Sequence, residues 1–331
     1  MNEGRDAIGV ELLMMCEAYC VKEFRRVYYE KIMFILLIGC LMLPTGAFAA
    51  DNASDSAHMN QVLEQDSSYE GFLANSETLT FEEIASLPGA SVISEYDSLL
   101  ELKMVPTSEL FKMGMSMDNV EKIKSKSVKE LVLDNAATYT DEILASKGLS
   151  DTQIDALRDG NYETITIEEA RDVGAHLALG IASISESGNN LNYNIYWHWD
   201  NSRPLNLIQD GVATSITNNY YVVGGATAKI WYAPLNSMTP VANGRISPIS
   251  SSGSNSTGFY VPMQKSTSGG LQWTQAGKAF IPTTGNNTGR KIDMFAEYFH
   301  KWTNLSISIA NGHISFPVGS GELTTASVSI H

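Results

Sequence analysis

The chain has 331 residues, of which 44% are hydrophobic and 9% aromatic, which is ordinary for a folded protein of about two domains. Its formal net charge of −15 excludes a general affinity for nucleic acid or for anionic membrane surfaces. All three cysteines lie within the first 40 residues, so the rest of the chain cannot form a disulfide.

The N-terminal region has the pattern of a secretory signal peptide. Twelve apolar residues at 32–43 follow a stretch with four basic residues between positions 22 and 31. Ala47 and Ala49 occupy the −3 and −1 positions of a cleavage site, so cleavage is expected after Ala49. A membrane span needs roughly 18 or more apolar residues, and this run is too short. Residues 1–49 are therefore predicted to be a signal peptide with an unusually long, acidic lead-in, and the mature chain to lack a transmembrane span.

The segment Leu37–Cys40, "LIGC", also resembles a bacterial lipobox, in which Cys40 would carry a lipid anchor. The chain stays apolar after Cys40, whereas a lipoprotein becomes polar at once, so the lipid anchor is the disfavoured alternative. Cleavage after Ala49 would also remove Cys16 and Cys20. A mature chain without cysteine suits a protein that a Gram-positive bacterium secretes or holds at its surface.

Composition divides the remaining chain in two. Residues 50–187 contain 26 acids and 9 bases, whereas residues 188–331 contain 5 acids and 8 bases and are rich in Ser, Thr, Asn and Gly. We expect a polar flexible leader at 50–76, an acidic helical domain at 77–186 and a Ser/Thr/Asn-rich β-sandwich domain at 190–331. The predicted fold class is α+β: a small acidic helical domain at the N-terminus, followed by an all-β antiparallel sandwich or flattened barrel.

Four capping boxes locate helix starts in the acidic region, because Ser or Thr is followed three residues later by Glu or Gln. They are Thr80–Glu83, Ser127–Glu130, Ser150–Gln153 and Thr166–Glu169. Helices are predicted at 81–87, 107–114, 118–125, 128–147, 151–158 and 167–184. The pair around Gly148 has the spacing of a helix-turn-helix. Asp151, Asp155 and Asp159 on its second helix would repel phosphates, so no nucleic-acid partner is expected.

Alternating apolar and polar residues predict strands at 193–199, 211–217, 219–223, 226–233, 256–263, 270–274, 278–281 and 291–300. The strongest signal is Asn311-Gly312, which favours a type I′ turn within a hairpin over 305–318. A two-residue loop pairs Ala310 with His313, Ile309 with Ile314 and Ser308 with Ser315. Isoleucines then share one face of the hairpin and serines the other. The short connections predict antiparallel sheets.

Catalytic motifs are absent: the sequence contains no GxSxG, HExxH, P-loop or DxDxDG pattern. His198 and Asp200 share a strand face and could supply two metal ligands, and His300 or His313 could add a third. Lone histidines in β domains are more often structural than metal-binding, and no cysteine is available to complete the set. No catalytic, metal-binding or cofactor-binding residue is assigned, and no cofactor is expected. A hydrolase remains an alternative, since two carboxylates suffice for glycoside cleavage. The acids of the β half are Asp200, Asp210, Asp293, Glu297 and Glu322.

The stretch 193–204, "YNIYWHWDNSRP", separates into two faces when it is read as a strand. The first face carries Tyr193, Ile195, Trp197 and Trp199, and it is typical of a core. The second face carries polar groups, and one of the adjacent Tyr220 and Tyr221 must face outward. The candidate ligand-binding residues are Tyr196, His198, Asp200, Arg203 and Tyr220.

We therefore expect an exported, non-enzymatic protein whose β domain binds an extracellular glycan, a cell-wall component or a protein. The first alternative is a secreted hydrolase acting on polysaccharide or cell wall. The second is a pore-forming protein, because the 305–318 hairpin alternates apolar and small polar residues. Its arms are shorter than the about 9–11 residues that a membrane-spanning strand needs.

Overall fold

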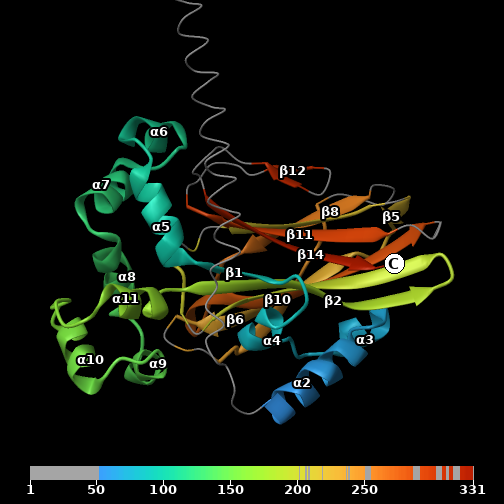
Figure 1. Cartoon of the computed structure of the whole chain (residues 1–331), viewed down its shortest axis with the longest axis horizontal. Coiled ribbons are helices and arrows are strands. Elements are labelled where there is room, and N and C mark those ends of the chain that lie inside the picture. Colours follow the sequence, from blue (N-terminus) through green and yellow to red (C-terminus); the bar gives the residue numbers. More distant parts are fainter. Residues whose placement is uncertain are drawn as a thin grey trace, which may run out of the picture. The chain divides into compact units, whose positions relative to one another are not determined.

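The computed structural model describes residues 52–200, 202–205, 207, 209–217, 219–235, 237, 239–249, 255–285, 291–302, 308–310, 313–315 and 321–330. The predicted signal peptide and the lipobox lie outside these residues. Ala53–His331 form one compact unit. In it, an N-terminal helical region and two antiparallel sheets confirm the predicted α+β fold class (Figure 1).

The described helices are α2 (Asn52–Gln65), α3 (Tyr69–Ala74), α4 (Phe81–Ala85), α5 (Glu95–Met104), α6 (Thr107–Lys112), α7 (Met117–Ser125), α8 (Val128–Ala136), α9 (Asp141–Ser146), α10 (Asp151–Arg158) and α11 (Ile167–Val173). Four of them, α4, α8, α10 and α11, begin where the capping boxes predict. All four predicted boxes have both reciprocal hydrogen bonds. In the first, Glu83 N donates to Thr80 Oγ1 at 3.2 Å and Thr80 N donates to Glu83 Oε2 at 2.8 Å.

Three helix predictions differ from the structure. The helix predicted at 128–147 is two helices, because Thr140 accepts from Ile143 N and starts α9. The segment 50–76, expected to be a flexible leader, forms α2 and α3 from Asn52 on and buries Phe72. The helix predicted at 167–184 is wrong beyond Val173, since 176–187 form a strand.

The large sheet has the order β1 (Ser91–Ser94), β2 (His176–Ser187), β3 (Asn190–Trp199), β10 (Gly270–Gly285), β6 (Thr227–Pro234) and β7 (Ala242–Ile246). The short strands β5 (Tyr220–Val222) and β9 (Gln264–Thr267) also pair with β10. The second sheet has the order β14 (Gly321–Ile330), β11 (Ile292–Lys301), β4 (Gln209–Ile216) and β8 (Ser256–Pro262). The two segments predicted at 270–274 and 278–281 are one strand with a bulge between Thr274 and Ala276.

The predicted hairpin register is confirmed in the described residues. β12 (Ser308–Ala310) pairs with β13 (His313–Ser315), and the pairs are Ser308 with Ser315, Ile309 with Ile314 and Ala310 with His313. Ile314 is buried against Ala213 and Phe299 of the second sheet. The hairpin is therefore packed on the sandwich.

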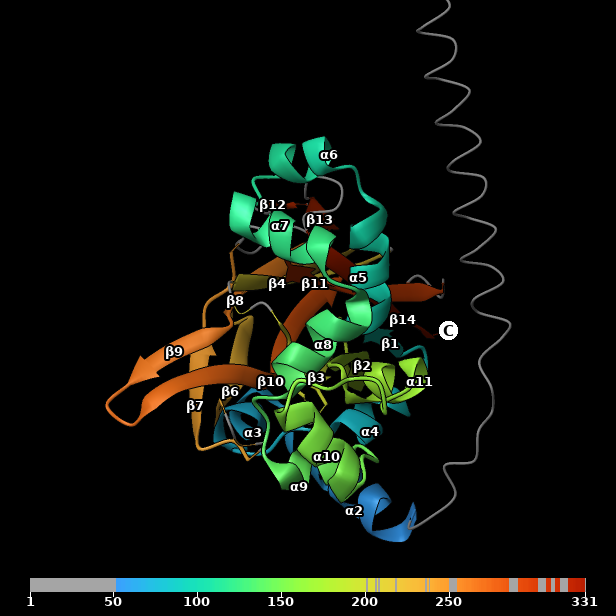
Figure 2. The same cartoon turned by 90° about the vertical axis from the view of Figure 1, so that its left-hand side faces the viewer.

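The helices α5–α11 lie between β1 and β2 in the chain and gather at one end of the sandwich (Figure 2). β1 and β2 pair directly, with Ser94 opposite His176. The chain thus leaves the sheet at Ser94 and returns beside the same residue. We call residues 95–175 the helical insertion.

The core between the two sheets contains the apolar face predicted for 193–199. Tyr193, Ile195, Trp197 and Trp199 all belong to it and are buried. Trp197 lies opposite Gly277 of β10. A Cβ atom on Gly277 would lie 2.2 Å from Trp197 Cζ2, so the indole packs directly on a backbone that only glycine allows.

We predict that Trp197→Ala lowers the free energy of unfolding by about 3–5 kcal/mol, because a fully buried indole leaves a cavity. Urea unfolding followed by circular dichroism measures this loss. Tyr221→Ala is the control, since that ring is 48% exposed and its removal should change stability by less than about 0.5 kcal/mol. Equal losses in the two variants would contradict the core assignment.

Candidate functional site

The structure does not bring the five candidate ligand-binding residues together. Tyr196 is buried on the outer face of the large sheet, where its hydroxyl donates to Asp66 Oδ2 at 2.8 Å. His198 is half-buried, and among the described residues its Nδ1 has no hydrogen-bond partner. Burial lowers the pKa of His198 to about 4, so this imidazole is neutral at physiological pH.

Asp200 and Arg203 bind the helical insertion. The Asp200 carboxylate accepts from His176 Nδ1 at 3.0 Å and is ion-paired with Lys147. The Arg203 guanidinium donates to Asn135 Oδ1 at 3.0 Å and to Thr138 Oγ1 at 3.1 Å. Both side chains therefore hold the helices against the end of the sandwich.

Aromatic stacking surfaces are scarce on the sandwich. Tyr220 is buried, and the adjacent Tyr221 is the one that faces solvent. None of the five tryptophans is more than 6% exposed. The indoles are therefore packing residues, as the alternation of Trp197 and Trp199 predicts, and they offer no open face to a sugar ring.

Acids of the β half are engaged within the fold. Asp210 is buried and accepts from Tyr298 Oη at 2.7 Å and from Lys301 N at 3.1 Å. Glu297 is buried too, and it accepts from Ile314 N at 2.8 Å. The described part of the chain contains no group of three or more His, Cys, Asp or Glu side chains that could hold a metal ion.

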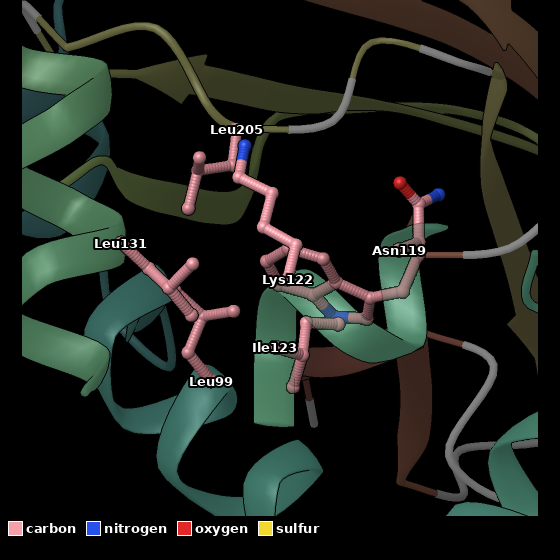
Figure 3. Close-up of a pocket in the computed structure, with 7 residues that line it drawn as sticks. Leu99, Asn119, Lys122, Ile123, Leu131 and Leu205 are labelled. Carbon is pink, nitrogen blue, oxygen red and sulfur yellow. The ribbon is translucent and has the colours of Figure 1, made fainter. Parts of the chain in front are cut away.

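A pocket opens in the helical insertion, where α5, α7 and α8 meet Leu205 and Trp302 (Figure 3). Its empty volume, open mouth included, is about 480 Å³. It is lined by Leu99, Asn119, Lys122, Ile123, Leu131, Leu205 and Trp302. We call this the Trp302 pocket. Its walls are apolar apart from one amide and one ammonium group, which suits an apolar side chain next to an anion.

Large apolar side chains are exposed on α5, α6 and α7, and two of these helices, α5 and α7, line the pocket. Met104 is 78% and Met117 71% exposed, and Leu100 and Phe111 are 40% and 43% exposed. These four are called the α5–α7 apolar residues. Residues 103–129 also carry six lysines and only three acids, although the surrounding half of the chain is strongly acidic. The same helices therefore present apolar and positively charged groups.

Buried ionisable side chains contact two of the residues that line the pocket. Trp302 contacts the His300 ring edge-on, with centroids 5.0 Å apart. His300 Nδ1 lies 3.1 Å from both carboxylate oxygens of Asp210. Glu95 Oε1 accepts from the backbone N of Leu205 at 2.5 Å. Two residues that line the pocket are thus positioned by buried ionisable side chains.

Burial raises the pKa of Glu95 to about 7, and nearby His300 opposes the shift. The pKa of Glu95 is about 7 in the folded protein and near 4.5 in the unfolded chain. Between these two pH values the folded protein therefore holds a proton on Glu95 that the unfolded chain has lost. The contribution of Glu95 to stability is therefore full below about pH 4.5 and falls as pH rises through 7.

We predict that Glu95→Gln raises the stability at pH 8 relative to the unchanged protein, by an amount on the order of 3 kcal/mol. At pH 4 the two proteins should be nearly equal. The glutamine oxygen can still accept from Leu205 N, so the variant removes the charge and retains the hydrogen bond. Thermal unfolding from pH 4 to pH 8 measures the difference, and a difference independent of pH would contradict the assignment.

Sequence reasoning missed this pocket. The helix α5, which supplies Leu99, has no capping box and was not predicted. The excess of lysines over residues 103–129 was readable in the sequence. Trp302 and Leu205 reach the pocket only through the fold, since they lie more than 70 residues away from Leu131 of α8 in the chain.

None of the helices among the described residues is long and apolar enough to cross a membrane.

No family model matches the chain, and no curated protein matches its sequence. One solved structure with a partial match is the collagen binding domain of Erysipelothrix rhusiopathiae surface protein RspB (7% identity, TM-score 0.23, 46% of this chain and 47% of that chain). Another is ACE19, the collagen binding subdomain of Enterococcus faecalis surface protein ACE (8% identity, TM-score 0.22, 44% and 91%). A third bears the description "Pore forming protein" (6% identity, TM-score 0.19, 47% and 80%). The chain spans about half the length of the RspB domain, and TM-scores this low carry no inference about ligand or activity.

Proposed function

We propose that this protein is exported from a bacterium and binds a protein partner outside the cell or at its surface, without catalysis. The partner docks on the helical insertion, with an apolar side chain in the Trp302 pocket and acidic groups near the lysines. The sandwich is the rigid support of this surface. The observation that carries the proposal is the exposure of the α5–α7 apolar residues on three consecutive helices, two of which, α5 and α7, also line a pocket with apolar walls.

Exposed methionines favour a protein partner. The flexible, polarisable methionine side chain adapts to irregular apolar surfaces and is common on surfaces that bind peptides. Met104 and Met117 are more than two-thirds exposed, so water covers apolar area that a partner could bury. A glycan would instead need an exposed aromatic ring, and the tryptophans are buried.

Charge specifies the partner further. Lys122 lines the pocket, and five other lysines lie between residues 103 and 129. A segment with acidic residues next to a large apolar residue would satisfy both the pocket and the lysines. We therefore propose an acidic, apolar protein segment as the ligand class.

We predict that Met104→Glu combined with Met117→Glu abolishes binding to such segments. The assay screens an immobilised library of synthetic peptides that vary in acidic and apolar content against the folded full chain. Acidic, apolar peptides should be enriched, and the double variant should lose them because it replaces apolar contacts by negative charge. Val241→Glu is the matched control, since Val241 is an exposed apolar residue outside the helical insertion.

Two results would overturn the docking surface. One is an enrichment that the double variant leaves intact, and the other is the absence of any enriched peptide. Retention of glycans in a parallel array, together with no peptide binding, would favour the glycan ligand expected from the sequence.

Export is tested separately. We predict that the mature protein begins at Ala50, because Ala47 and Ala49 satisfy the cleavage pattern after the apolar run at 32–43. N-terminal sequencing of the protein recovered from culture medium and from cells identifies the first residue. A mature chain that begins with a lipid-modified Cys40 would show the lipobox alternative to be correct.

A further inference from the structure

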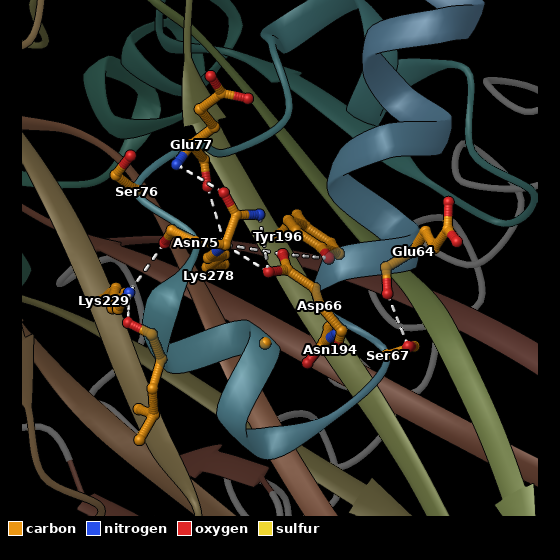
Figure 4. Close-up of polar contacts among 12 residues, drawn as sticks. Glu64, Asp66, Ser67, Asn75, Ser76, Glu77, Asn194, Tyr196, Lys229 and Lys278 are labelled. Carbon is orange, nitrogen blue, oxygen red and sulfur yellow. Dashed lines mark hydrogen bonds and ion pairs between the residues drawn. The ribbon is translucent and has the colours of Figure 1, made fainter.

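A lysine is completely buried on the outer face of the large sheet. Lys278 of β10 and Asp66, which follows α2, have fully buried side chains that form an ion pair. Lys278 Nζ lies 2.6 Å from Asp66 Oδ1 and 2.8 Å from Oδ2, and it donates to the carbonyl of Glu77 at 2.8 Å. Figure 4 shows these contacts beneath the N-terminal helices.

The amide of Asn75 shares the same carboxylate. Asn75 Nδ2 donates to Asp66 Oδ1 at 3.0 Å, and Asn75 Oδ1 accepts from Glu77 N at 2.9 Å. One oxygen of Asp66 is therefore hydrogen-bonded to both the Lys278 amine and the Asn75 amide nitrogen (Figure 4). If the lysine amine attacked the side-chain amide, Lys278 Nζ would replace Asn75 Nδ2 on the carbonyl carbon Cγ of Asn75.

Burial lowers the free energy needed to deprotonate Lys278 to its neutral, nucleophilic form. Nζ lies 5.0 Å from the centre of the Phe72 ring and 5.6 Å from that of Trp231. Burial lowers the pKa of Lys278 to about 8, against the opposing effect of Asp66. Burial also excludes bulk water, which would otherwise compete with the amine for an activated carbonyl.

We propose that Lys278 Nζ and Asn75 Cγ form an intramolecular amide bond, with Asp66 as the group that transfers protons. Asp66 first takes a proton from the ammonium group, which leaves a neutral amine and a neutral carboxylic acid. The amine attacks Cγ, and Asp66 donates its proton to Nδ2. The Cγ–Nδ2 bond then breaks, ammonia leaves, and Asp66 removes the second proton from Nζ.

The atoms and charges of this reaction balance without a further reactant. An ammonium group, a carboxylate and a primary amide become a secondary amide, a carboxylic acid and ammonia. The bond replaces a buried ion pair, whose desolvation is costly, by neutral groups. It would also join the N-terminal segment after α3 to the centre of the large sheet, and so prevent that segment from detaching. This inference is independent of the proposed ligand.

Intact mass spectrometry of the folded full chain tests the bond. The expected mass is lower than that calculated from the sequence and the observed N-terminus, by the mass of one ammonia. Digestion should yield one branched peptide that contains both Asn75 and Lys278. Lys278→Met and Asp66→Ala should restore the full mass.

Lys229→Met is the matched control, because Lys229 Nζ donates to the backbone carbonyls of Leu73 and Asn75 in the same region and is not the attacking amine. This variant should retain the loss of ammonia. The unchanged protein decides the question even where a variant fails to fold. Its full calculated mass would overturn the proposal, as would a loss of water that maps to a bond between Lys278 and Asp66.

Discussion

The central strands of the large sheet, β2, β3 and β10, are buried on both faces over their middle parts, and the arrangement of the remaining elements depends on this constraint. The inner face of the large sheet packs on the second sheet, and its outer face packs on Val62, Leu79 and Ile84 of the N-terminal segment. An unpaired Lys278 in that outer layer would be strongly destabilising. Asp66 supplies the opposite charge, so the segment that carries it is part of the sheet's own stability.

Predictions that depend on neighbours in the chain are confirmed. Each capping box is satisfied within four residues, the hairpin register follows from its two-residue turn, and the inward residues of 193–199 follow from strand alternation. The error at 176–187 has the opposite cause. Leu177, Leu179 and Ile181 pack inward while Ala178 and Ala182 pack under α4, so both faces are apolar and the alternation is weak.

The surroundings of the candidate ligand face could not be predicted from the sequence for the same reason. Alternation marks Tyr196 and His198 as outward, and outward means solvent only when one face of the sheet is open. Asp66 covers Tyr196 from 130 residues away in the chain, and no local pattern predicts such docking. The Trp302 pocket has the same origin, since Leu205 and Trp302 are brought to the helices by the fold and not by their position in the chain. The six lysines of residues 103–129, in contrast, can be recognised in the sequence as a local excess of positive charge within an acidic region.

The burial of the large sheet also affects where a binding surface can lie. The sandwich buries its indoles and the carboxylates of Asp210 and Glu297, so these groups are not exposed for recognition. The helical insertion is held by the pairing of Ser94 with His176, by Lys147 on Asp200 and by Arg203 on Asn135. Because both of its ends join adjacent strands, its outer residues can vary without changing the sheet register. Exposed methionines on α5 and α7 are thus tolerated by the fold, and in the function proposed above a protein partner would cover them.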